Sequence, residues 1–292
     1  MAKITHFQEP VKNSPSRLSG FNGKFSEIIP RMLTGKNEAG EIVDVMRTPI
    51  SLKQLIFERL HNEYQLDRNN LRSKNLSVGD IMISSDEGGV IGLYSNPVVR
   101  ELVNSITPAK EIKHSLNLFS VNSEQYEAVK KGGFFIDQEF LLKLAYTREG
   151  IWELGARYRK VKDQFWEFVT EGDKGLLEDY INLLQEFNKR NSNEGFYENM
   201  MDFIGLGLCQ QGFNFLGISG IYSSSFGSHV FNNCSSNLIG IAKEMPAREY
   251  LETRIGESVV TALDEKKPFK YNGTIYVPVQ GVTLRKAESP DL

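Results

Sequence analysis

The sequence predicts an α/β fold in which a mixed sheet core is flanked by helices and followed by a helical and β C-terminal region. Apolar residues recur at helical spacing from Ile50 to Leu66, which predicts an amphipathic helix. Two short apolar runs, Val78 to Ser84 and Val90 to Tyr94, flank Ser85-Asp-Glu-Gly-Gly89 and predict a β-hairpin. From Glu111 to Val121 apolar and polar residues alternate, which is typical of a strand.

Length and composition are those of an ordinary globular protein. At roughly 150 residues per domain, 292 residues correspond to about two domains. Hydrophobic residues make up 40% and charged residues 24% of the chain, which argues against a disordered or fibrous protein. Because no apolar run reaches the roughly 20 residues of a membrane span, we expect a soluble, cytoplasmic protein.

Charge, cysteine and histidine exclude several classes of site. The net charge of −3 is not that of a protein that is basic over its whole length. Cys209 and Cys234 are too few for a disulfide framework and lack the spacing of a zinc site. The four histidines are scattered, so the sequence contains no zinc-binding HExxH motif, and it contains no GK[ST] phosphate-binding loop.

The pattern of turn residues and helices predicts three parts. Residues 1–49 are rich in proline and glycine and predict an irregular arm that contains one short helix, Phe25 to Leu33. Residues 50–145 are expected to form the catalytic core, and residues 146–292 a helical and β recognition region. The remaining predicted elements are a strand at Phe134 to Ile136, a hairpin at Phe269 to Val277, and helices at Pro97 to Ile106, Ser123 to Lys131, Gln138 to Tyr146, Ile151 to Thr170, Lys174 to Asn188 and Pro246 to Leu263.

The string Lys110-Glu-Ile-Lys-His-Ser115 has the chemistry of a metal-dependent hydrolase. On a strand, Glu111 and Lys113 point to the same side while Ile112 points to the other. A carboxylate can hold a divalent cation there, and an ammonium group can orient the attacking water and offset developing charge. The second carboxylate that such a site needs is Asp80 on the earlier strand, or Asp86 in the turn that follows it.

The order of these elements resembles the PD-(D/E)XK nuclease superfamily, which includes many restriction endonucleases. In that superfamily a helix precedes a strand with an acidic residue, and a Glu-x-Lys strand, a helix and a further strand follow. The corresponding segments run from about Ile50 to Ile136. The resemblance implies hydrolysis of double-stranded DNA by a Mg²⁺-dependent endodeoxyribonuclease, of the type II restriction kind, and allows for a homodimer.

The resemblance also implies roles for individual residues. Asp80 and Glu111 would bind the metal together with the carbonyl oxygen of Ile112, and Glu63 on the preceding helix would be an additional ligand. Lys113 would position the attacking water. Gln125, on the helix after the Glu-x-Lys strand, would support the site.

Two other interpretations remain open at this stage. A Glu-x-Lys triplet on a strand is also typical of a solvated sheet face with a weak ion pair, and Asp264-x-Lys266 is a second match of the same kind in a different context. The segment Gly217 to Tyr222 and the predicted helix and hairpin after it are loosely similar to the end of a phage capsid subunit. The alternative functions are therefore a virion structural or assembly protein, or a binding module without catalytic activity.

Overall fold

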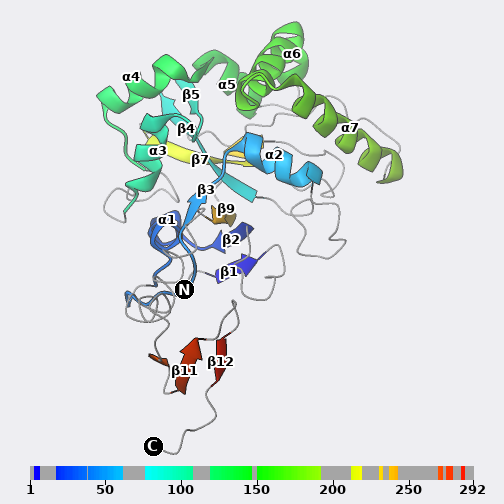
Figure 1. Cartoon of the computed structure of the whole chain (residues 1–292). Coiled ribbons are helices and arrows are strands. Elements are labelled where there is room, and N and C mark those ends of the chain that lie inside the picture. Colours follow the sequence, from blue (N-terminus) through cyan, green and yellow to red (C-terminus); the bar gives the residue numbers. More distant parts are fainter. Residues whose placement is uncertain are drawn as a thin grey trace, which may run out of the picture. The chain divides into compact units, whose positions relative to one another are not determined.

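The structure is a computed structural model of the whole chain (Figure 1). It describes residues 3–6, 18–37, 39–61, 76–107, 119–146, 150–191, 212–218, 230–232, 237–242, 269–271, 274–278 and 284–286. Contacts between these residues divide the chain into two compact units. The larger comprises Met1–Thr34 and Arg47–Ala242, and the smaller comprises Gly35–Met46 and Lys243–Leu292.

A mixed sheet forms the centre of the larger unit, and the described residues contribute nine strands to it. Its main path runs β1-β2-β9-β4-β5-β6, while β3 pairs with β9, and β7 pairs with both β4 and β8. All pairs are antiparallel except β4 with β9, which meet in parallel at Ser77 and Leu238. The strands are β1 Lys3–His6, β2 Leu18–Asn22, β3 Arg47–Pro49, β4 Leu76–Ser85, β5 Gly88–Gly92, β6 Phe134–Asp137, β7 Gly212–Ile218, β8 Val230–Asn232 and β9 Asn237–Ala242.

Helices cover both faces of this sheet, so the larger unit has three layers (Figure 1). Side chains alternate along β4: Ile81 and Ile83 join a core with helices α1, α3 and α4, whereas Val78 and Met82 join a core with α2, α5, α6 and α7. The helices are α1 Phe25–Thr34, α2 Leu52–His61, α3 Pro97–Asn104, α4 Ser123–Gly132, α5 Gln138–Tyr146, α6 Gly150–Val169 and α7 Lys174–Asn191. The predicted mixed α/β architecture is confirmed at this level.

Most local predictions agree with the structure. The hairpin is formed by β4 and β5, whose register pairs Ser85 with Gly88. Helix α3 begins where Asn96 caps it through the N–H of Val98 and Pro97 occupies its first turn. Helices α6 and α7 meet at a turn that contains Gly172, as expected, although α6 is broken at Gly155. Helix α2 is described only as far as His61, so the predicted end of this helix at Leu66 lies outside the described residues.

The predicted pairing of Val78–Ser84 with Glu111–Val121 is wrong at the end that the structure describes. Both edges of β4 are occupied from Ile81 to Ser84, one by β5 and the other by β7. Phe119 pairs with Phe213, on the opposite edge of β7. β7 therefore lies between β4 and this residue. A strand more than 100 residues distant in the sequence fills the position, and no local pattern indicates such a pairing.

The N-terminal residues are not a separate arm in the structure. β2 pairs with β9 along its whole length, and β3 pairs with the C-terminal part of β9. Phe25, Ile28 and Met32 of α1 are fully buried in one of the two cores. The predicted boundary near residue 49 therefore does not separate two sets of contacts. Strands β2 and β3 belong to the central sheet, and helix α1 packs on one of its faces.

Strand β6 is present as predicted, but it is not buried along its length. It pairs only with β5 among the described strands and ends the main path of the sheet. Phe135 is 41% exposed, whereas Ile136 is buried. Phe134 and Ile136 pack in the core with α5, α6 and α7, whereas the Phe135 ring points to the other face, where Lys130 of α4 lies 5.3 Å from its centre.

The smaller unit contains the predicted C-terminal hairpin. β10 (Phe269–Tyr271) pairs with β11 (Thr274–Pro278) on either side of Asn272-Gly273, and β12 (Leu284–Lys286) pairs with β11. An Asn-Gly pair suits the tight turn of a two-residue hairpin. The predicted helix from Pro246 to Leu263 lies outside the described residues.

We predict that Gly88→Ala destabilises the larger unit. Gly88 closes the β4–β5 turn with a φ of 146°, and an added Cβ would collide with the carbonyl oxygen of Ile136. We expect a loss of at least about 1 kcal/mol in the free energy of unfolding, measured by chemical denaturation. Gly175→Ala is the control, because Gly175 lies in the first turn of α7 and its Cβ would meet only Asp173 Oδ1 at 3.8 Å. Equal stability of the two variants would contradict the described turn.

Candidate functional site

Among the residues predicted to form the metal site, the structure describes Asp80 and Gln125. Glu63, Glu111, Ile112 and Lys113 lie outside the described residues. The described residues contain no group of three or more His, Cys, Asp or Glu side chains that could hold a metal ion. Of the predicted site residues, the structure therefore gives the contacts of Asp80 and Gln125.

Asp80 is fully buried in β4, and both of its carboxylate oxygens accept backbone hydrogen bonds. Leu52 N–H donates to Oδ2 at 2.6 Å, and Tyr94 N–H donates to Oδ1 at 2.7 Å. Burial raises the pKa of Asp80 to about 7, while the two N–H groups act in the opposite direction. The side chain thus joins the first residue of α2 to the segment that follows β5.

Gly79, the neighbour of Asp80, allows the same two segments to approach β4 closely. A Cβ at this position would lie 2.8 Å from both Pro49 Cβ and Tyr94 Cγ, which is too short for a normal contact. The N–H of Gly79 donates to the carbonyl oxygen of Ile50 at 2.6 Å. A glycine within a strand is typical of places where other parts of the chain come near the backbone.

In the structure Asp80 is a buried hydrogen-bond acceptor. Its side chain is fully buried, and each of its two oxygens accepts one backbone N–H. Asp86, the other acidic residue considered, is exposed in the β4–β5 turn. The position of Asp80 is explained by its contacts within the fold.

Gln125 belongs to the capping box of α4. Asn122 Oδ1 accepts the N–H of Gln125 at 2.8 Å, and Gln125 Oε1 accepts the N–H of Asn122 at 3.2 Å. Such reciprocal bonds satisfy two backbone donors at the start of a helix. Helix capping uses the oxygen of this side chain and leaves its Nε2 outside the pair.

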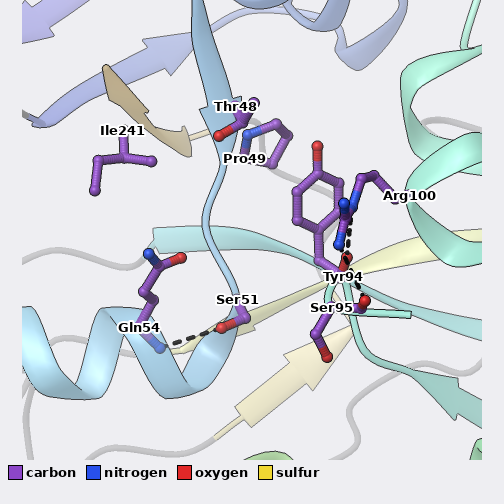
Figure 2. A pocket seen from close by; sticks show the side chains of 8 residues that line it. All are labelled: Thr48, Pro49, Ser51, Gln54, Tyr94, Ser95, Arg100 and Ile241. Atoms are coloured by element: carbon purple, nitrogen blue, oxygen red, sulfur yellow. Dashed lines mark hydrogen bonds between the residues drawn. The ribbon is translucent and has the colours of Figure 1, made fainter. Parts of the chain in front are cut away.

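A cavity of about 270 Å³ opens next to the segments that Asp80 joins (Figure 2). One side of it is formed by β3 and the start of α2, another by the segment between β5 and α3, and β9 completes it. Its wall combines apolar side chains with hydroxyl, amide and guanidinium groups. The described residues that line it are Thr48, Pro49, Ser51, Gln54, Tyr94, Ser95, Arg100 and Ile241.

Arg100 of α3 is fixed at the rim of this cavity by three contacts. Its Nη2 donates to the carbonyl oxygen of Ser95 at 3.0 Å, and its Nε donates to that of Tyr94 at 3.4 Å. The guanidinium carbon lies 5.9 Å from the centre of the Tyr94 ring, within range of a cation–π interaction. Figure 2 shows the guanidinium beside the Tyr94 ring and near Ser95. Arg100 therefore presents an oriented positive charge at the cavity.

The turn between α6 and α7 is bound to the same rim. Glu171 Oε1 accepts a hydrogen bond from Ser95 Oγ at 2.7 Å, and its Oε2 pairs with Lys53 Nζ at 3.2 Å. The hydrogen bond from Ser95 and the ion pair with Lys53 lower the pKa of Glu171. Glu171 has a φ of 53°, a strained conformation for a residue other than glycine. The two interactions keep it there and connect the helical pair to α2 and α3.

The described residues that line the cavity include no His, Cys, Asp or Glu. Their polar groups are hydroxyl, amide and guanidinium groups. Sequence reasoning did not identify Arg100, Tyr94 or Glu171, because no motif marks them. The only local signal was the Gly-Asp pair at 79 and 80, inside an otherwise apolar strand.

The chain matches no known protein-family model, no curated protein and no solved structure. None of the helices in the described part of the chain is both long enough and apolar enough to cross a membrane.

We predict that the Asp80 carboxyl makes the larger unit less stable as the pH rises from 4 to 8. The folded state keeps a proton on Asp80 up to a pKa of about 7, whereas the ordinary pKa of the unfolded chain is 3.8. The folded state thus binds more protons in this window, so its stability falls as the pH rises, by up to about 4 kcal/mol. The measurement is the free energy of unfolding at both ends of the window.

Asp80→Asn is the comparison for this prediction. The variant should be less stable at low pH, because its side-chain nitrogen cannot accept a hydrogen bond from one of the two N–H groups. Its free energy of unfolding should lack the pH dependence that the Asp80 carboxyl contributes. The lowered pKa of Glu171 changes the free energy of unfolding only at pH values below its ordinary pKa of 4.5. That range lies mostly outside this window. Parallel pH profiles of the two proteins would show that the buried carboxyl does not titrate as described.

Proposed function

We propose that this chain is a metal-dependent endodeoxyribonuclease that hydrolyses phosphodiester bonds of double-stranded DNA, of the kind found in type II restriction systems. The observation that carries the proposal is Glu111-Ile-Lys113, located in the sequence between the β4–β5 hairpin and helix α4. α2, β4, α4 and β6 follow one another in the order expected for a restriction-endonuclease-like core, which supports the proposal.

In this proposal, residues from three parts of the sequence would hold the metal. Glu111, the carbonyl oxygen of Ile112 and Glu63 would be its ligands. Asp86, in the β4–β5 turn, suits the role of the second carboxylate better than Asp80, because its side chain is exposed, whereas that of Asp80 is fully buried and bonded to two backbone amides. A bound Mg²⁺ supplies an acidic water and neutralises charge on the phosphate.

The remaining residues act on the water and on the developing charge. The Lys113 ammonium orients the attacking water and stabilises the negative charge that grows on the phosphate oxygens. Gln125 supports the site through its Nε2 amide, since its Oε1 is used in the capping box of α4. Glu111 and Lys113 are two positions apart in the sequence, and on a strand such a pair would place its side chains on one face and let them act together.

We predict that Glu111→Gln and Lys113→Ala each reduce DNA cleavage by about 100-fold or more while unfolding stays cooperative. The assay follows the cleavage of a long bacteriophage DNA into fragments in the presence of Mg²⁺ or Mn²⁺. A long DNA is used because it contains many different sequences. Lys266→Ala is the matched control, because Asp264-x-Lys266 repeats the triplet in a different context. Unchanged cleavage in both site variants, or none by the wild-type protein with either metal, contradicts the proposal.

We also predict that Ca²⁺ supports DNA binding but not hydrolysis. Ca²⁺ neutralises carboxylate and phosphate charge, but it accepts a looser and higher coordination than Mg²⁺. Binding should weaken steeply with increasing salt, because contacts with phosphates release counterions. Fluorescence anisotropy of a labelled duplex at several salt concentrations measures this, and an affinity independent of salt would exclude a phosphate-contacting surface.

A further inference from the structure

We propose that the cavity lined by Tyr94 and Arg100 binds the phosphate group of a nucleotide. The ligand chemistry is a phosphate ester: several hydrogen-bond acceptors on one tetrahedral group, attached to a small organic portion. The source of the ester is either the DNA backbone or a free phosphorylated molecule. Its assignment to DNA rests on the proposed function, whereas the phosphate chemistry follows from the cavity alone.

Arg100 supplies the positive charge and several unused donors. A guanidinium group has five N–H donors, and the described contacts of Arg100 use one on Nε and one on Nη2. Of the described residues that line the cavity, it is the only charged one. Its contacts with two carbonyl oxygens and with the Tyr94 ring hold the group in one orientation, so little side-chain freedom is lost when a ligand binds.

Neutral donors face the cavity from a second direction. Ser51 Oγ accepts the backbone N–H of Gln54 at 3.2 Å, which leaves its own O–H free to donate to a ligand. Thr48 and the Gln54 amide add further donors from β3 and from the first turn of α2 (Figure 2). Donors from separate elements suit a tetrahedral oxyanion better than a planar carboxylate, which a bidentate pair would satisfy.

The acidic group near the rim does not oppose an anion strongly. Glu171 is paired with Lys53, so the two charges compensate each other. The Ser95 hydroxyl donates to Glu171 and hence offers a ligand only its oxygen. Among the described residues, Arg100 makes no ion pair that would neutralise it in the same way.

The rest of the wall fits the organic part of an ester. Pro49, the Tyr94 ring and Ile241 give the cavity an apolar side. The volume of about 270 Å³ is close to the lower end of ligand pockets, roughly 300 Å³, which is room for one small ligand. Asp80 and Gly79 fix the two segments that form the walls, so the cavity exists before a ligand arrives.

The test is an NMR titration of the full chain with thymidine 5′-phosphate, with thymidine and with inorganic phosphate, all without a divalent metal. We expect thymidine 5′-phosphate to shift the backbone signals of Thr48, Ser51 and Ser95, and thymidine to bind at least about tenfold more weakly. Arg100→Ala should weaken binding at least about tenfold. Arg157→Ala is the matched control, because Arg157 is also an exposed arginine over an aromatic ring, 5.6 Å from the centre of Phe140.

Two further variants keep the test decisive if Arg100→Ala affects folding. Thr48→Val removes a donor with little change of shape and should weaken binding a few-fold. Arg100→Lys keeps the charge but not the paired N–H geometry and should fall between wild type and Arg100→Ala. Shifts outside the cavity only, or equal weakening by Arg100→Ala and Arg157→Ala, would overturn the phosphate site.

Competition separates the two sources of the phosphate. If thymidine 5′-phosphate displaces a labelled duplex in Ca²⁺, the cavity contacts DNA. If it binds with the expected dependence on Arg100 but displaces no duplex, the assignment to DNA is overturned and a free phosphorylated ligand is established. Because the titration needs neither metal nor cleavage, an inactive wild-type protein that still binds thymidine 5′-phosphate would disprove the nuclease and leave the phosphate site intact.

Discussion

The buried carboxylate of Asp80 is the interaction on which the architecture around the cavity depends. A carboxyl group is costly to bury. Asp80 offsets that cost because its two oxygens accept backbone N–H groups from two segments far apart in the sequence. One segment begins α2 and the other leads into α3. Without this acceptor, the N–H groups of Leu52 and Tyr94 would remain buried without partners, and neither segment would be fixed to β4.

The other interactions of the cavity extend from this point. Tyr94 carries its ring over Gly79 on one side and supports the Arg100 guanidinium on the other. Ser95, the next residue, binds Glu171 and so connects the α6–α7 turn to the same rim. The described cavity offers hydrogen-bond donors from Arg100 and from hydroxyl and amide groups. Glu111 and Lys113, the acid and the lysine of the proposed chemistry, lie outside the described residues.

Sequence reasoning succeeded where the determinants are local and failed where they are distant. The β4–β5 hairpin and the helices α3 and α4, all of which were predicted, are set by neighbouring residues. The insertion of β7 beside β4 depends on residues more than 100 positions away, so the predicted partner of β4 was wrong. Asp80 has the same sequence signature as a metal ligand on a strand, and its hydrogen bonds with the amides of Leu52 and Tyr94 could not be read from that signature. Arg100 has no signature at all, because its neighbours come from separate elements.

The most direct test of the account is to locate a bound paramagnetic ion in the wild-type protein. Mn²⁺ replaces Mg²⁺ in oxygen-rich sites and broadens the NMR signals of nearby nuclei. We expect substoichiometric Mn²⁺ to broaden the backbone signals of Glu111, Ile112 and Lys113 first and to leave those of Leu52 and Tyr94 sharp. Early loss of the Leu52 and Tyr94 signals would place the ion at Asp80 and contradict its role as a buried acceptor of backbone amides, and absence of selective broadening would contradict the metal-dependent nuclease.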